Sequence, residues 1–287
     1  MTNTESGSER GSLIPDFASE KEKKRFFSSL PDTDRIRIFH EILRKSSHTV
    51  FLSGPGISTS CGVSNIRAVR EFRQPDGKKV RKYDTEYVLS TECLSKEPEL
   101  FYTFFRQEMD VRSAAPGITH NKIAEMEKAG VLDGVITVNT DGLHQKAGSR
   151  HVEELCGNAN VCRCETCRVS YSSDLIFDST GAVPVCPVCG RMLRPTITLY
   201  GEMLPEEELF SARHMIDEAD CLITAGCSFK SDVTRSLAAR FRGKFLIIIN
   251  PGKTRMDPKA DLLFHAGADR IMRQIDVDRL TGKEKTR

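Results

Sequence analysis

The sequence of 287 residues contains no tryptophan, and aromatic residues make up only 7% of it. It also lacks an apolar run of the ~18 residues that a transmembrane helix needs, so we expect no membrane span. Charges of the two signs nearly cancel, with 42 Lys and Arg against 40 Asp and Glu. A net charge of +2 gives no electrostatic reason to expect nucleic-acid binding. The 39% of hydrophobic residues can fill a globular core.

The first 31 residues are polar, rich in Ser and Glu, and predict a disordered tail. Residues 1–20 contain four acidic residues and no apolar core, so we expect neither a secretory signal nor a mitochondrial presequence. Residues 21–25, KEKKR, could act as a nuclear-import patch, although a solvated charged surface is the more common cause of such a run. We therefore expect the protein in the nucleus or the cytoplasm.

Ten cysteines are present, and four of them form two Cys-x-x-Cys pairs. Cys164 and Cys167 form the first pair, Cys186 and Cys189 form the second, and 18 residues separate the pairs. This spacing predicts a structural zinc site, because four thiolates fill a tetrahedral shell and leave no open position for catalysis. Cys162 lies close enough to compete as a ligand, but Cys164 already has its partner at the right spacing. Zinc-type cysteines indicate a reducing compartment.

Short, wholly apolar segments alternate with amphipathic segments along most of the chain. The apolar segments predict buried strands at residues 48–53, 135–138, 221–225 and 245–249. Between them, apolar residues at helical spacing predict amphipathic helices. This alternation predicts an α/β fold, a Rossmann-like parallel sheet with helices on both faces.

The expected Rossmann-like domain comprises residues 32–156 and 197–275, and a small zinc module, residues 157–196, is inserted between its two parts. Residues 64–115 are charged and irregular, and they predict a small helical subdomain with a loop inside the first part. Residues 276–287 are expected to form a flexible tail.

A polar or glycine-containing turn follows each of the four predicted strands. Alone, each has an ordinary explanation, since glycine turns end strands and an Asx turn closed by Gly142 would account for the second. Because the carboxyl ends of parallel strands meet at one edge of a sheet, the four together predict a nucleotide cleft, with N–H groups of the first turn against a phosphate. The turns are Gly54-Pro55-Gly56-Ile57-Ser58, Asn139-Thr140-Asp141-Gly142, Gly226-Cys227-Ser228 and Asn250-Pro251-Gly252.

Six short motifs follow one another between residues 34 and 275. They are Ser53-Gly54-Pro55-Gly56-Ile57-Ser58, Asn139-Thr140-Asp141-Gly142-Leu143-His144, Glu154-Leu155-Cys156-Gly157-Asn158, Cys186-Pro187-Val188-Cys189-Gly190, Leu193-Arg194-Pro195 and Tyr200-Gly201-Glu202. Their residues and order resemble those of the sirtuins, the NAD-dependent protein-lysine deacylases. The third motif stands where that family has its catalytic histidine motif.

The resemblance implies a Rossmann domain and a small zinc domain flanking a cleft, with NAD entering from one side and an acylated protein lysine from the other. The acyl oxygen attacks the nicotinamide ribose, nicotinamide leaves, and a histidine activates a ribose hydroxyl. The resemblance places Cys156, Asn139 and Asp141 at the catalytic positions. It assigns cofactor contact to Gly54, Pro55, Gly56, Ile57, Ser58, Asn65, Ile66, Arg67, Val138, Asn139, Asp141, Gly226, Cys227, Ser228, Asn250 and Ala268.

The sequence departs from the family pattern at the chemistry itself. Cys156 stands in place of the catalytic histidine, Val138 in place of a glutamine that contacts the ribose, and Pro55 in place of an alanine. Residues 64–67, SNIR, stand in place of Pro-Asp-Phe-Arg, so only the arginine is kept. An ordinary thiol has a pKa of ~8.5 and is mostly protonated at neutral pH, which makes cysteine a poor base there.

Loss of a general base typically costs ~10²–10⁴ in rate. We expect neither His144 nor His151 to replace it, because residues five apart on an extended strand face opposite sides and His144 fits the ordinary family pattern. Two functions stay open: a deacylase of weak activity, and a pseudoenzyme that binds NAD, ADP-ribose or an acylated protein within a complex. ADP-ribosyl transfer also requires nicotinamide cleavage, so the same losses weigh against it.

Overall fold

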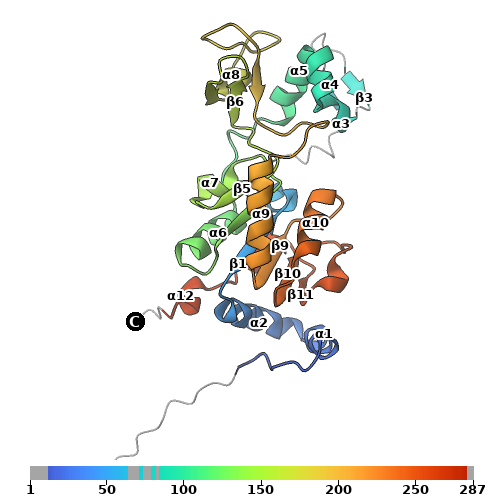
Figure 1. The fold of residues 1–287 in the computed structure, drawn as a ribbon, viewed down its shortest axis with the longest axis vertical. Coiled ribbons are helices and arrows are strands. Elements are labelled where there is room, and N and C mark those ends of the chain that lie inside the picture. The colour runs from blue at the N-terminus through green and yellow to red at the C-terminus, as the bar shows by residue number, and fades with distance from the viewer. Residues whose placement is uncertain (1–11, 64–70, 74–78, 82–83, 283–287) are drawn as a thin grey trace, which may run out of the picture.

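The computed structural model describes residues 12–63, 71–73, 79–81 and 84–282. Figure 1 shows two lobes stacked along the long axis of the molecule. The lower lobe holds the large sheet, and the upper lobe holds the cysteine-rich segment beside a group of short helices. Among the described helices, none has the length and apolar character needed to cross a membrane.

The lower lobe is built on a six-stranded sheet in which all neighbouring pairs are parallel. Its strands are β1 (Thr49–Ser53), β4 (Gly134–Thr137), β5 (Val152–Glu154), β9 (Cys221–Ala225), β10 (Phe245–Ile249) and β11 (Leu262–Phe264). They lie in the order β11-β10-β9-β1-β4-β5. β1, β4, β9 and β10 are buried throughout, which explains their largely apolar sequences. The predicted parallel sheet is confirmed.

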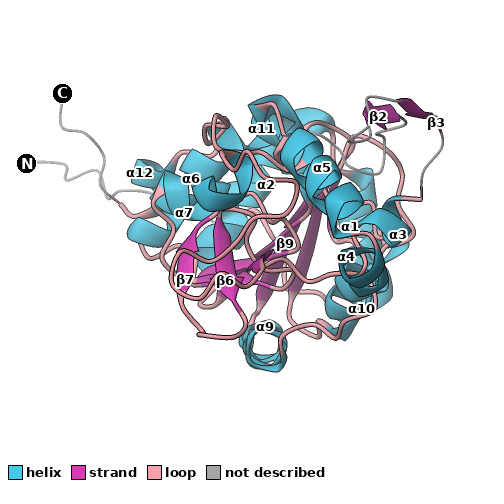
Figure 2. Cartoon of the chain, turned by 90° about the horizontal axis from the view of Figure 1, so that it is seen from above, coloured by secondary structure: helices cyan, strands magenta, loops and turns pink. Residues whose placement is uncertain are grey.

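Helices cover both faces of this sheet, as the view from above in Figure 2 shows. One face carries α2 (Asp32–Lys45), α6 (Ile118–Lys128) and α11 (Ala268–Met272), and the other carries α9 (Glu206–Glu218) and α10 (Asp232–Arg240). Successive strand residues serve the two faces, since Phe51 packs in the first core and Leu52 in the second. The predicted helical cover of both faces is confirmed.

Both predicted tails are ordered where the structure describes them. Residues 12–31 include helix α1 (Glu20–Ser29), and Ile14 and Phe27 are buried against the first core. At the other end, α12 (Val277–Leu280) packs Val277 into the same core. Disorder over residues 12–31 and flexibility over 276–282 are therefore wrong predictions, because a few apolar side chains fix polar segments. Residues 1–11 and 283–287 lie outside the described part.

The helical subdomain and the zinc module share one core in the upper lobe. The first comprises β2 (Glu71–Arg73), β3 (Lys79–Arg81), α3 (Thr85–Val88), α4 (Thr91–Lys96) and α5 (Pro98–Glu108). The second comprises β6 (Val161–Cys164), β7 (Ser170–Ser172), α8 (Asp174–Phe177) and β8 (Leu193–Pro195), and its sheet has the order β7-β6-β8. Phe101 and Phe105 of α5 are fully buried against Cys162 and Leu193 of the zinc module, so neither part has a core of its own.

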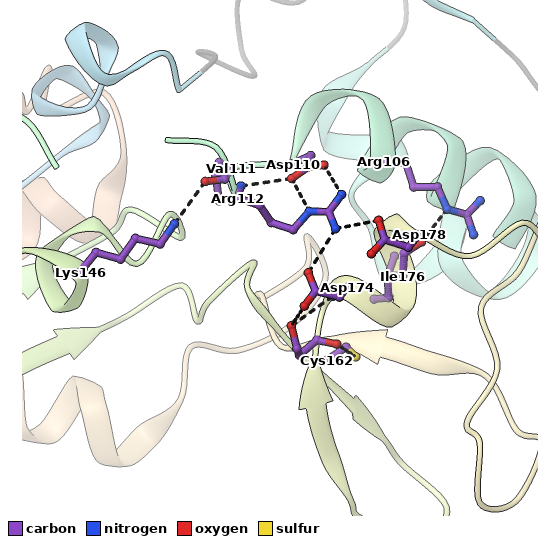
Figure 3. A network of polar contacts seen from close by, with 10 residues as sticks. Arg106, Asp110, Val111, Arg112, Lys146, Cys162, Asp174, Ile176 and Asp178 are labelled. Atoms are coloured by element: carbon purple, nitrogen blue, oxygen red, sulfur yellow. Dashed lines mark hydrogen bonds and ion pairs between the residues drawn. The ribbon is translucent and has the colours of Figure 1, made fainter. Parts of the chain in front are cut away.

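Arg112 lies in the link between α5 and α6 and ties it to the zinc module (Figure 3). Its guanidinium contacts Asp178 at 2.8 Å and Asp174 at 3.1 Å, and Asp110 at 2.8 Å. From the lower lobe, Lys146 of α7 (Leu143–Ala147) donates to Val111 O at 3.4 Å. The segment between α5 and α6 is thus bonded to the zinc module of the upper lobe and to α7 of the lower lobe.

Candidate active site

The turns after β1, β9 and β10 meet at one end of the sheet. Gly54 N donates to Ala225 O at 3.0 Å, and Gly56 N donates to Gly226 O at 3.1 Å, so the first turn lies against the end of β9. Gly226 N donates to Ile249 O at 3.1 Å and joins the ends of β9 and β10. The carboxyl edge of the sheet is therefore a continuous surface of turn residues.

Glycine is required where the first and third turns touch. A Cβ atom on Gly54 would lie 2.7 Å from Gly226 O, and one on Gly56 would lie 2.7 Å from Gly226 Cα. Gly226 itself has φ +65°, which favours glycine. The N–H groups at 54, 56, 57 and 58 all donate to backbone carbonyl groups, and proline at 55 has none. In this structure the turn thus bonds its N–H groups within the protein, and its contact with a phosphate stays a prediction.

A buried polar cluster lies where the turns after β1 and β4 meet. Asn139 Nδ2 donates to Ser58 Oγ at 3.1 Å, and Ser58 Oγ donates to Asp141 Oδ2 at 2.7 Å. Asn139 is 5% exposed, and its Oδ1 has no hydrogen-bond partner among the described residues. An unpartnered buried acceptor is costly, so this oxygen is well suited to a donor group of a ligand. The observation fits an amide or hydroxyl group of NAD.

Two histidines stand behind this cluster, and both are neutral at physiological pH. Burial, and then the charge of His120, lower the pKa of His144 to about 3, and its Nε2 lies 2.9 Å from Ser53 Oγ. Burial also lowers the pKa of His120, whose Nε2 lies 3.4 Å from Ser58 Oγ. The rings meet edge to face, with centroids 5.0 Å apart. As neutral, buried rings they shape the cluster and are poorly placed to bind a proton.

Cys156 follows β5 at the same edge of the sheet. Thr137 of β4 pairs with Glu154 of β5, and Leu155 N donates to Thr137 O at 3.0 Å. The pairing ends at Glu154, and the chain then turns, with Gly157 N donating to Glu154 O at 3.0 Å. Cys156 is half-buried. Its backbone carbonyl accepts a hydrogen bond of 2.9 Å from the N–H of Thr198, which follows β8. The structure therefore joins this residue to both lobes.

His151 precedes β5, at the opposite end of that strand from Cys156. Its Nδ1 lies 3.0 Å from Asp133 O, at the amino end of β4. The strand itself separates this ring from the cleft edge. The structure gives His151 no path to the position of the missing base.

The remaining candidate residues differ in exposure. Ser228 is exposed, Asn250 and Val138 are half-buried, and Cys227 and Ala268 are buried. Ala268 begins α11, which packs beside the first turn. Their contact with a cofactor stays a prediction. Asn65, Ile66 and Arg67 lie outside the described residues.

The four cysteines of the zinc prediction converge on one point. Their sulfur atoms all lie within 4.8 Å of one another, with Cys164 to Cys189 at 3.4 Å and Cys167 to Cys186 at 3.6 Å. Zinc–sulfur bonds of ~2.3 Å in a tetrahedron place the sulfur atoms ~3.8 Å apart, so the cluster fits zinc. Cys162 instead donates to Ser172 O at 3.4 Å and is not part of the cluster.

Two contributors to the site gave no usable signal in the sequence. His120 reaches the buried cluster from α6, and Asp269 of α11 accepts hydrogen bonds from Thr119 N at 2.9 Å and Ser60 Oγ at 2.9 Å. These contacts hold the start of α6 against the first turn. They join segments distant in the sequence, and no local motif predicts such a junction.

Comparisons with known proteins agree on one family. The model of the Sir2 family matches residues 54–232. An NAD-dependent protein deacetylase of Cutibacterium acnes is 37% identical over 237 residues, which are 81% of this chain and 94% of the relative. One of Staphylococcus aureus is 36% identical over 224 residues, 78% of this chain and 90% of the relative.

The chain belongs to the Sir2, or sirtuin, family. Solved sirtuin structures share its fold. A Sir2 protein bound to a propionylated peptide has a TM-score of 0.74 and 30% identity, covering 87% of this chain and 99% of the other. A Sir2 complex with a p53 peptide and NAD⁺ has a TM-score of 0.73, with the same identity and coverage. The predicted family and fold are confirmed, and NAD and a structural zinc are the cofactors that fit this sirtuin.

Proposed function

We propose that this sirtuin binds NAD and an acylated protein lysine at the carboxyl edge of its sheet and acts as an NAD-dependent deacylase of strongly reduced turnover. One observation carries the proposal: Ser58 accepts a hydrogen bond from Asn139 Nδ2, and the buried Asn139 Oδ1 has no hydrogen-bond partner in the described part of the chain. The cluster supplies a ready acceptor for the nicotinamide end of NAD. The relatives described as NAD-dependent protein deacetylases, and a related structure with a propionylated peptide, support the acyl-lysine substrate.

The reduction in turnover follows from Cys156. In the reaction that the family implies, a base must activate a ribose hydroxyl after nicotinamide has left. His120 and His144 are buried and neutral. The Nε2 atom of His120 is hydrogen-bonded to Ser58, and that of His144 to Ser53. We therefore expect a rate lower by ~10²–10⁴ than that of a sirtuin with its histidine.

Nicotinamide release tests the proposal. The zinc-loaded protein is incubated with NAD and acetylated or propionylated lysine peptides, and nicotinamide is measured over many equivalents of enzyme. We expect slow multiple turnover that requires the peptide. Turnover no higher than that of Cys156→Ala would remove the deacylase proposal.

The second candidate is a binding protein without turnover, and the same pairing of features favours it. The polar cluster around Asn139 is intact, whereas the residue at the base position has changed. Calorimetry with NAD and with ADP-ribose distinguishes the candidates: binding without peptide-dependent turnover supports this one. Failure to bind either compound, with zinc in place and the fold intact, would contradict both candidates.

A further inference from the structure

The segment that leads from β5 into the zinc module contains a connected network of side-chain hydrogen bonds. Asn158 Nδ2 donates to both oxygens of the Glu154 carboxylate, at 2.9 and 3.1 Å. Asn158 Oδ1 accepts from Asn160 N at 2.9 Å and from Asn160 Nδ2 at 3.1 Å. Asn160 Nδ2 also donates to Asp141 O at 2.9 Å. The network therefore runs from the end of β5 to the turn after β4.

Each amide in this network has only one workable orientation. A backbone N–H can only donate, so the contact with Asn160 N requires the oxygen of Asn158 on that side. A backbone carbonyl can only accept, so Asp141 O requires the nitrogen of Asn160. The nitrogen of Asn158 must then face residue 154, where an ionised carboxylate supplies two acceptors. Glu154 therefore stabilises the one orientation of Asn158 that completes the network.

The same segment holds the turn after β4 at several points. Ala159 N donates to Thr140 O at 2.7 Å, so two successive carbonyl groups of that turn are bonded to it. A Cβ atom on Gly142 would lie 2.9 Å from Asn160 Nδ2 and 3.2 Å from Asn158 Nδ2. Glycine at this position thus allows the two amides to pack against the turn.

Asp141 connects this network to the candidate binding group. Its Oδ2 accepts from Ser58 Oγ at 2.7 Å, and Ser58 Oγ accepts from Asn139 Nδ2 at 3.1 Å. The position of the unpartnered Asn139 oxygen therefore depends on a turn that the Glu154 network holds.

We propose that Glu154 is a positioning residue for NAD binding: by orienting Asn158, it holds the turn that carries Asn139 in its binding conformation. The inference rests on the proposed binding of NAD. Burial raises the pKa of the Glu154 carboxyl, and hydrogen bonds from Asn158 and Gln145 oppose that rise. Among the described residues this carboxyl forms no ion pair within 4.0 Å, so neutral amides stabilise its charge. A partly buried carboxylate without a cation is costly, and such costs are typical of functional sites.

An exchange of the two side-chain chemistries tests the proposal. Asn158→Asp sets a second carboxylate against Glu154, and Glu154→Gln leaves one acceptor where there were two. In the double variant the new glutamine can donate to the new aspartate, whose other oxygen still accepts from Asn160. Calorimetry with NAD should show Kd raised roughly tenfold in Asn158→Asp, less in Glu154→Gln, and restored to within roughly threefold in the double variant.

Glu153→Gln is the matched control. It makes the same change one residue earlier, keeps an acceptor for Ser211 Oγ, and should leave the Kd for NAD unchanged. Urea unfolding of every variant separates affinity from stability. If Asn158→Asp lowers the free energy of unfolding but binds NAD as the unaltered chain does, the network is only structural and the inference is overturned.

The double variant separates the remaining outcomes. If it binds NAD no more tightly than Asn158→Asp, the inference is overturned, whereas NAD binding by the unaltered chain leaves the proposed function standing. If Asn158→Asp does not fold, the double variant is compared with Glu154→Gln, and it should bind NAD more tightly. If the unaltered, zinc-loaded chain binds no NAD, the inference falls together with the proposed binding on which it rests.

Discussion

Asn139 donates a hydrogen bond of 3.1 Å from Nδ2 to Ser58 Oγ, and this contact joins the turn after β4 to the turn after β1. Because Ser58 Oγ already donates its one hydrogen bond to Asp141 Oδ2 at 2.7 Å, it can only accept from the amide, which must therefore present its nitrogen here. Its oxygen is thereby turned away from Ser58 and left without a partner among the described residues. A structural hydrogen bond therefore fixes the orientation of a candidate binding group.

Asn139→Ala should weaken NAD binding. Loss of an acceptor that meets a ligand donor in a buried site costs ~1–3 kcal/mol, which is roughly a 5- to 150-fold rise in Kd. Calorimetry with NAD measures the change. Asn121→Ala, the same substitution at an exposed position of α6, is the matched control and should bind as the unaltered chain does. Equal affinities in the two variants would remove Asn139 from the binding site.

Gly56→Ala should destabilise the fold. The new Cβ would lie 2.7 Å from the backbone of Gly226, and two packed turns would have to separate, at a cost of ~1–3 kcal/mol. Gly252→Ala is the control, since its Cβ would meet only Asn250 Nδ2, at 3.9 Å. Urea unfolding measures both variants. Equal urea midpoints for Gly56→Ala and Gly252→Ala would show that the two turns have room for the added methyl group.

The main sheet was predictable because each of its core strands is a short apolar run that can be recognised alone. The zinc cysteines were predictable because the Cys-x-x-Cys spacing contains the knuckle geometry. The order at residues 12–31 was not predictable, because it depends on Ile14 and Phe27 meeting a core built by distant segments. The fused core of the upper lobe depends likewise on α5 packing against a segment far along the chain.

The candidate site likewise has features that the sequence predicts and features that it does not. The turns could be assigned to one edge, because parallel strands end together. Their internal bonding could not: the first turn uses its N–H groups on the backbone, and His120 enters from α6 without a motif. Motif spacing predicts where in the fold a site lies, whereas the hydrogen bonds within the site depend on the tertiary packing.

Cys186→Ser should remove zinc and unfold the zinc module. One of four ligands is lost, and the metal that would cross-link the two cysteine pairs of the zinc module is no longer held. Metal analysis and a melting curve measure the effect, together with a fall in solubility. Cys162→Ser is the matched control, because residue 162 lies outside the cluster and a hydroxyl can still donate to Ser172 O. A normal melting curve without zinc would contradict a structural role for the metal.

Arg112→Met should loosen the link between the lobes. The variant loses ion pairs to Asp110, Asp174 and Asp178, and because the guanidinium is partly exposed we expect a fall in Tm of only roughly 2 °C, smaller at high salt. Scanning calorimetry at low and high salt measures it. Arg235→Met, which removes a surface pair within α10, should leave Tm unchanged. An effect of Arg112→Met that is independent of salt would rule out an electrostatic link.

The buried ring of His144 should make the fold less stable in acid. Its pKa is 6.5 when exposed and about 3 in the folded protein, so between these values the unfolded chain binds a proton that the folded chain excludes. The contribution of the neutral ring is complete above pH 6.5 and is lost as the pH falls toward 3, by at most ~1.4 kcal/mol per pH unit. His144→Gln keeps a donor for Ser53 and cannot titrate, whereas the carboxylates of the two proteins titrate alike. Urea unfolding across this range should therefore show the free energy of unfolding of the unaltered chain falling more steeply than that of the variant, and parallel curves would place His144 in contact with solvent.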